Sequence, residues 1–123
     1  MKTNKNEMLS KSSRNEFIYE FKNTSAMVHS IAKSKGWWDE PRREGELIAL
    51  IHSELSEALE GLRHGNPKSE HIPEFSALEE ELADVVIRVM DMAESLNCKL
   101  AEAIIEKIKF NETRPFKHGG KKF

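Results

Sequence analysis

The sequence is poor in several features that mark whole classes of protein. Its single cysteine, Cys98, excludes an internal disulfide and is typical of a reducing compartment. No apolar run approaches the roughly 20 residues of a membrane-spanning helix, and the polar opening, residues 1–16, has no signal-peptide core. The formal net charge of -2 lacks the basic excess of a general nucleic-acid binder. We therefore expect a cytoplasmic protein that binds neither a membrane nor nucleic acid.

The features that are present favour a single helical domain. A chain of 123 residues can form one domain with a core, and 38% hydrophobic with 33% charged residues suits a helix-rich protein. Apolar residues recur at helical spacing in four segments, and no segment alternates with the period of a strand. We predict an all-α fold of four helices, with flexible ends at residues 1–12 and 117–123. The expected helices span residues 14–35, with a capping box at Ser13 and Glu16, then 44–63, 76–96 and 100–112.

Two of the expected helices carry a pair of carboxylates beside the apolar stripe. At about 100° per residue, Glu54 falls within the apolar arc of helix 44–63, and Glu57 falls at its margin. On the next helix Glu81 lies at the edge of the stripe and Asp84 lies just beyond it. Each pair has the i, i+3 spacing that places side chains about 5–6 Å apart at Cβ.

These carboxylates converge on one place if the two helices pack antiparallel. They would then repel one another unless a cation lies between them. Oxygen ligands without histidine or cysteine favour Mg2+ or Mn2+, and magnesium commonly shares its coordination with substrate phosphates. The alternative is a solvated glutamate-rich face, which is what a single E-x-x-E usually represents. The remaining acids of helix 76–96 are expected to face solvent: Glu79, Glu80 and Asp91.

The two acid pairs resemble a known family signature. Glu54-x-x-Glu57, followed after a loop by Glu81-x-x-Asp84, resembles the E-x-x-E and E-x-x-D motifs of MazG-like nucleotide pyrophosphohydrolases, the all-α NTP pyrophosphatase superfamily. The ending "KIKFNETRPFKHGGKKF" is similar to the C-terminal pattern of that family. The resemblance implies a four-helix MazG-like bundle that binds Mg2+, with Mn2+ as a substitute. It also implies hydrolysis of a (d)NTP to the (d)NMP and pyrophosphate, in keeping with house-cleaning of the nucleotide pool.

The resemblance also implies roles for individual residues. The four acids, Glu54, Glu57, Glu81 and Asp84, become the metal ligands and the catalytic residues. Some family members have a further glutamate directly before the first ligand. Here that position is Ser53, so no role of that glutamate carries over.

Residues that would bind the nucleoside triphosphate lie on both sides of the acidic motifs. Lys107, Asn111 and Arg114 recur at one-turn intervals, where a basic helix end is the ordinary alternative to phosphate contact. The family pattern favours phosphate contact for them. Trp37 and Trp38 fall where related enzymes place an aromatic residue near the base, and we expect one to stack on the base and the other to pack in the core.

Helix 76–96 is apolar over more than one side, because Val86, Ile87 and Met90 widen its stripe. Four short helices cannot easily cover such a helix. We therefore expect a homodimer or a dimer of dimers, as in the family.

A helical chain with paired acids suggests three other functions. A di-iron or di-manganese carboxylate bundle is excluded, because it needs Glu-x-x-His and none of the five histidines has a glutamate three residues before it. A phosphoribosyl-ATP pyrophosphohydrolase-like enzyme, which would use similar acids, stays open. So does a non-enzymatic helical interaction module.

Overall fold

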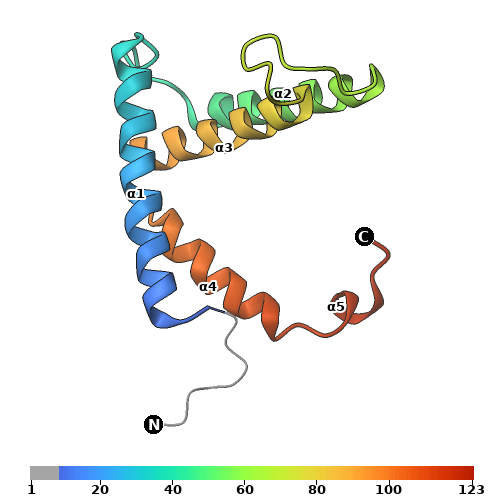
Figure 1. The fold of residues 1–123 in the computed structure, drawn as a ribbon. Coiled ribbons are helices and arrows are strands. Elements are labelled where there is room, and N and C mark those ends of the chain that lie inside the picture. Colours follow the sequence, from blue (N-terminus) through green and yellow to red (C-terminus); the bar gives the residue numbers. More distant parts are fainter. Residues whose placement is uncertain (1–8) are drawn as a thin grey trace. The chain divides into compact units, whose positions relative to one another are not determined.

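A computed structural model describes residues 9–123, and Figure 1 shows their helices. Within that range there is no strand, only an isolated bridge between Lys68 and Ser76. The predicted all-α fold with four main helices is therefore confirmed, and the bounds of the second and fourth helices are as predicted. The helices are α1 (Lys11–Ser34), α2 (Glu44–Arg63), α3 (Ala77–Ser95), α4 (Leu100–Glu112) and the short α5 (Lys117–Gly120).

The two ends that were predicted to be flexible are residues 1–12 and 117–123, and the structure describes only part of the first. Residues 1–8 of the first lie outside the described range, and α1 already begins at Lys11. In the second, Lys117–Gly120 form α5, whose backbone is left-handed at His118 and Gly119, and residues 121–123 follow without regular structure. Within residues 9–123 no helix combines the length and the apolar composition needed to cross a membrane.

The start of α1 differs from the prediction. Ser10, not Ser13, caps the helix: the Ser10 hydroxyl accepts the backbone N–H of Ser13 at 3.0 Å. Ser13 lies inside the first turn, so the predicted capping box with Glu16 is wrong. Ser10 offers the same capping chemistry three residues earlier, and no proline or glycine in the intervening residues stops the helix from starting there. At its other end α1 stops before Gly36, as predicted, because Gly36 has a φ of +89°.

The chain divides into two compact units, each of which is described by itself. The α4 unit comprises residues 9–23 and 99–123, and its buried apolar residues are Ala101 and Ile105. In it, the Lys22 ammonium lies 3.3 Å from the Glu102 carboxylate. The α2–α3 unit spans Thr24–Cys98 and contains the second half of α1 together with α2 and α3.

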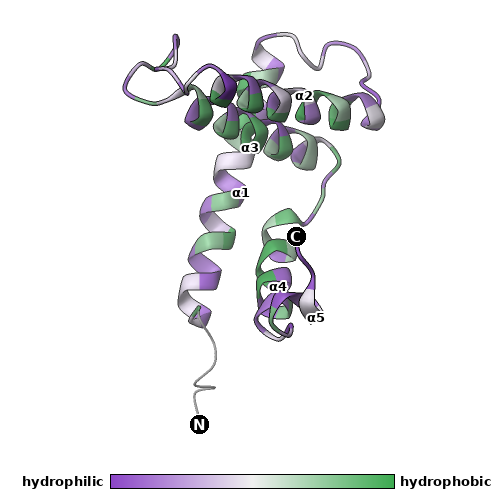
Figure 2. Ribbon diagram, turned by 90° about the vertical axis from the view of Figure 1, so that its right-hand side faces the viewer, coloured by the Kyte–Doolittle hydropathy of each residue, from purple (hydrophilic) through white to green (hydrophobic). Residues whose placement is uncertain are grey.

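Helices α2 and α3 lie side by side and run antiparallel (Figure 1). Gly61 makes the close approach possible, since a Cβ atom there would meet the Cβ of Ala77 at 3.2 Å. Leu47 and Ala58 are the buried apolar residues of α2. Figure 2 shows apolar residues recurring along both helices with hydrophilic ones between them. The pairing of Gly61 with Ala77 fixes a register in which Glu54 lies opposite the acidic turn of α3.

The connection between α2 and α3 is held by its own polar groups. The buried Ser69 hydroxyl accepts the backbone N–H of Ile72 at 3.0 Å and of His71 at 3.2 Å, and it donates to Glu80. Ser76 forms a capping box with Glu79 at the start of α3. These bonds fix where α3 begins, and therefore where its acids lie along α2.

Candidate metal and nucleotide site

The hairpin of α2 and α3 brings the predicted acid pairs together. Carboxylate oxygens of Glu54, Glu57 and Glu81 all lie within 4.8 Å of one another. Oxygens of Glu80, Glu81 and Asp84 do so as well, so that Glu81 belongs to both groups. These groups could hold a metal ion. The four acids named from the sequence, Glu54, Glu57, Glu81 and Asp84, are called the acidic cluster below.

The acidic cluster carries more negative charge than its surroundings balance. Burial, hydrogen bonding with Glu54, and the charges of Glu57, Glu54 and Asp84 raise the pKa of Glu81 to about 7. The Oε2 atom of Glu81 is buried and has no hydrogen-bond partner among residues 9–123. Burial, followed by the charge of Glu54, also raises the pKa of Asp84. A divalent cation would remove this repulsion.

The chemistry of these donors fits magnesium or manganese. All are carboxylate oxygens, the ligands that hard cations prefer, and they come from two helices rather than from one exposed face. Glu57 is exposed and Glu54 and Glu81 are half-buried, which leaves one side open to a substrate. The buried, unpartnered Oε2 of Glu81 is the specific observation that favours a cation over a solvated surface.

Arg88 is a member of the site that the sequence analysis missed. Its Nε–H donates to Oε1 of Glu54 at 2.9 Å, across the two helices. Arg88 follows Asp84 by four residues and Glu81 by seven, so all three lie on one face of α3. That spacing is visible in the sequence and could have identified it.

Asp91 was expected to face solvent, and this prediction is wrong. Its carboxylate accepts the indole N–H of Trp38 at 3.0 Å and lies 2.7 Å from Nδ1 of His29. The Asp91 side chain is only 14% exposed. It therefore joins α3 to α1 and to the turn between α1 and α2, where the half-buried Trp38 meets it with its indole N–H.

The prediction that Glu80 faces solvent is also wrong, because residues outside α3 contact its carboxylate. It accepts hydrogen bonds from Ser69 and interacts with His71, whose Nδ1 lies 2.6 Å from Oε1 of Glu80. These two contacts lower the pKa of Glu80, and the bond to Glu80 raises the pKa of His71. The partners come from the connecting loop, which the helical periodicity of α3 does not reveal.

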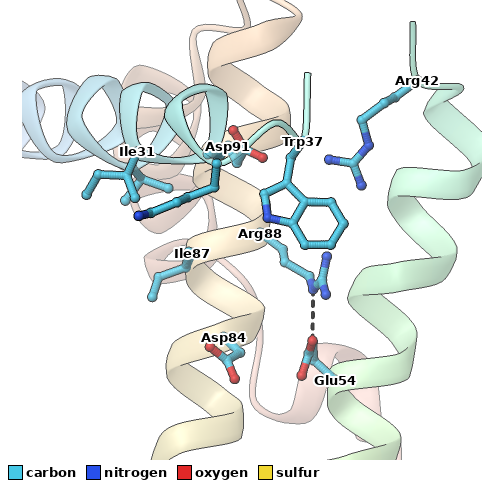
Figure 3. Close-up of a pocket in the computed structure, with 11 residues that line it drawn as sticks. Ile31, Trp37, Arg42, Glu54, Asp84, Ile87, Arg88 and Asp91 are labelled. Atoms are coloured by element: carbon cyan, nitrogen blue, oxygen red, sulfur yellow. Dashed lines mark hydrogen bonds and ion pairs between the residues drawn. The ribbon is translucent and has the colours of Figure 1, made fainter. Parts of the chain in front are cut away.

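A cavity of about 350 Å3 lies beside the acidic cluster, within the α2–α3 unit. Figure 3 shows Trp37 and Arg42 along it from the turn before α2, Glu54 from α2, and Asp84 and Arg88 from α3. Trp37 is 64% exposed. The Arg42 guanidinium lies 4.9 Å from the ring of Trp38 and 5.9 Å from that of Trp37. An aromatic face, two guanidinium groups and carboxylates thus line one cavity.

The predicted phosphate-binding residues of α4 belong to the α4 unit. Lys107 Nζ lies 4.6 Å from the ring centroid of Phe110, and the Arg114 guanidinium lies 5.4 Å from it. Asn111 and Lys107 are exposed, and Arg114 is half-buried. The structure therefore brings the two basic residues of this set together around Phe110.

Comparisons with protein-family models, with curated proteins and with solved structures found no match to this chain.

Proposed function

We propose that this chain is a magnesium-dependent nucleoside triphosphate pyrophosphohydrolase of the MazG-like type, which converts a (d)NTP to the (d)NMP and pyrophosphate. One observation carries this proposal. Two acid pairs lie on antiparallel helices beside a cavity that Trp37 and two arginines line. Oxygens of Glu54, Glu57 and Glu81 lie within 4.8 Å of one another, as do those of Glu81, Asp84 and the neighbouring Glu80. The E-x-x-E and E-x-x-D spacing of those pairs is the pattern that resembles the family.

Glu54, Glu57, Glu81 and Asp84 would hold the metal. A bound magnesium ion neutralises charge on phosphate oxygens and makes a coordinated water more acidic. The unbalanced charge of the acidic cluster is the property of the chain that favours this binding.

In the reaction, water attacks the α-phosphorus, the bond from this atom to the α–β bridging oxygen breaks, and pyrophosphate leaves. A carboxylate of the acidic cluster orients that water. Ser53, at the position of the further glutamate of some family members, has no carboxylate that could take a proton from the water, and its hydroxyl donates to the backbone oxygen of Leu50 at 2.6 Å. The proton therefore has to go to the cluster itself or to solvent.

The base and the phosphates would be bound by separate groups. Trp37 offers an exposed indole face for base stacking, which contributes about 1–3 kcal/mol per base in other proteins. Trp38 is engaged with Asp91, so its part is to support the turn that carries Trp37. Lys107, Asn111 and Arg114 of the α4 unit are proposed to contact the leaving phosphates, on the basis of the family pattern and of the positive charge of Lys107 and Arg114.

Assembly into a homodimer or a dimer of dimers is part of the same proposal. No residue of α3 is buried, and its Leu82 and Val86 expose 46% and 50% of their surface. Leu55 and Leu59 of α2 expose 45% and 50%. Apolar side chains that recur along both helices in this way favour burial against a second copy. Sedimentation at micromolar concentration tests this, and a stable monomer there would contradict it.

A panel of ribo- and deoxynucleoside triphosphates, with phosphoribosyl-ATP included, tests the activity. We expect magnesium-dependent formation of a nucleoside monophosphate and pyrophosphate, resolved by chromatography, and no turnover in excess EDTA. Turnover of phosphoribosyl-ATP alone would assign the related enzyme instead. Consumption of no nucleotide in the panel would reject the proposed function.

Hydrolysis in 18O-labelled water identifies the bond that is broken. Attack at the α-phosphorus places the label in the monophosphate and leaves pyrophosphate unlabelled. Label in pyrophosphate alone would show attack at the β-phosphorus.

A further inference from the structure

Arg88 is the basic residue that contacts the acidic cluster. Among residues 9–123, no other lysine or arginine forms an ion pair with Glu54, Glu57, Glu81 or Asp84. Its side chain is 37% exposed, whereas that of Glu54 is 12% exposed. Figure 3 shows the guanidinium group of Arg88 directed at Glu54 from the edge of the cavity.

The bond to Glu54 uses only a small part of the hydrogen-bonding capacity of Arg88. A guanidinium group has five N–H donors, and only the Nε–H of Arg88 has a partner in the described part of the chain. Arg88 lines the cavity, and Figure 3 shows its guanidinium group between Trp37 and Glu54. The planar pair of donors of a guanidinium group matches two oxygens of one phosphate group.

Glu54 in turn connects Arg88 to the metal donors. A carboxylate oxygen of Glu54 lies within 4.8 Å of carboxylate oxygens of Glu57 and Glu81. The positive guanidinium group beside Glu54 partly neutralises the negative charge that would attract a divalent cation. Removal of the guanidinium charge should therefore strengthen the binding of a cation and weaken the binding of a phosphate.

We propose that Arg88 binds the polyphosphate of the substrate in this cavity while its Nε–H holds Glu54. This inference rests on the proposed function, which it deepens by assigning a phosphate contact within the α2–α3 unit. With Arg88 present, the site binds a divalent cation together with a polyphosphate more tightly than it binds the cation alone.

The test compares wild type with Arg88→Gln, Arg88→Lys and the matched control Arg63→Gln. Arg63 lies on α2, pairs with Glu60 at 2.8 Å, and is 65% exposed, so its loss removes the same charge away from the cavity. Calorimetry measures the affinity for Mg2+ alone, and then for inorganic tripolyphosphate at saturating Mg2+. Tripolyphosphate provides the phosphate chemistry without a base.

In Arg88→Gln we expect Mg2+ alone to bind about 5-fold more tightly or better, since a nearby positive charge is lost. Tripolyphosphate should bind about 10-fold more weakly or worse, since a charged hydrogen bond is lost. Arg88→Lys should keep the wild-type affinity for Mg2+ and lose part of the affinity for tripolyphosphate, because an ammonium lacks the planar fork. Arg63→Gln should change neither affinity.

Opposite changes for the two ligands would not follow from a purely structural role, which would weaken both. Equal or parallel changes in Arg88→Gln overturn the inference. If that variant does not fold, Arg88→Lys decides, and a wild-type affinity for tripolyphosphate in it overturns the inference. The expected pattern in a protein that hydrolyses no nucleotide would reject the proposed function alone. Turnover in wild type without this pattern in Arg88→Gln would reject the role of Arg88 alone.

Discussion

The α2–α3 hairpin and the α4 unit each bring side chains of like charge together, but the surroundings of those side chains differ. In the hairpin, carboxylates of Glu54 and Glu81 are half-buried and lie within 4.8 Å of a third carboxylate. In the α4 unit, Lys107 is exposed, and Lys107 of α4 and Arg114, which follows α4, both lie near the ring of Phe110. The acids therefore repel one another in a partly desolvated place, whereas the basic residues gain a favourable contact with an aromatic ring.

This difference distinguishes a ligand-binding site from a charged surface that needs no ligand. A solvated basic helix end needs no ligand to be stable, so charge and spacing alone say little about it. A half-buried carboxylate whose pKa is raised to about 7, with one oxygen unpartnered, makes the fold less stable unless a cation balances it. The hairpin is thus the region in which the structure favours a ligand, and α4 is the region in which only the family pattern does.

The largest effect should come from the acids of the hairpin. We expect Glu54→Gln or Glu81→Gln to lower kcat by about 100-fold or more at saturating Mg2+, because a ligand of the metal is lost. The fold should stay intact, as judged by circular dichroism. Glu60→Gln is the matched control on α2, since Glu60 is exposed and pairs with Arg63. A wild-type kcat in Glu54→Gln would contradict the metal-ligand assignment.

The next effect concerns stability without metal. The pKa of Glu81 is raised from 4.5 to about 7 in the folded protein, so the folded state favours the protonated form. Its contribution to stability is fully present below pH 4.5 and is lost as pH rises towards 7. Above that pH, Glu81→Gln should be more stable than wild type by about 2 kcal/mol, a value reduced for solvent screening.

Urea unfolding in EDTA at pH 4.5 and at pH 8 measures this difference. The advantage of Glu81→Gln should be small at the lower pH and full at the higher one. An advantage that is the same at both values of pH would mean that repulsion within the acidic cluster is not its cause.

The smallest expected effect tests α4. If its basic residues contact phosphates, Lys107→Gln should raise KM by about 10-fold, through the loss of one charged hydrogen bond. Lys109→Gln is the control on the same helix, because Lys109 lies 3.4 Å from Glu106 and belongs to no predicted site. Equal KM values for the two variants would show that Lys107 does not contact the phosphates and is only a solvated surface residue.

The helices could be predicted from the sequence because their signals are local. The apolar spacing of α2 and α4 and the residues that end them, such as Gly65 and Pro115, suffice to give their bounds. The same spacing placed Glu54 and Glu81 beside the apolar stripe, and the structure brings both into the acidic cluster.

The partners of the site could not be predicted in the same way. Glu80 and Asp91 lie on the polar side of α3, and the residues that cover them, Ser69 and Trp38, come from segments outside that helix. No periodicity within α3 contains that information. Arg88 is different, because its spacing from Glu81 and Asp84 already placed it on their face.

The free energy of unfolding as a function of Mg2+ concentration tests most directly whether the hairpin holds a metal. Ligand that binds only the folded state stabilises it, by about 1.4 kcal/mol at a concentration ten times the Kd. We predict a rise of this kind in the wild-type protein and in Glu60→Gln, and its loss in Glu54→Gln and Glu81→Gln. Stability of the wild-type protein that does not change with Mg2+, or a rise that is equal in all four proteins, would contradict a metal site in the acidic cluster.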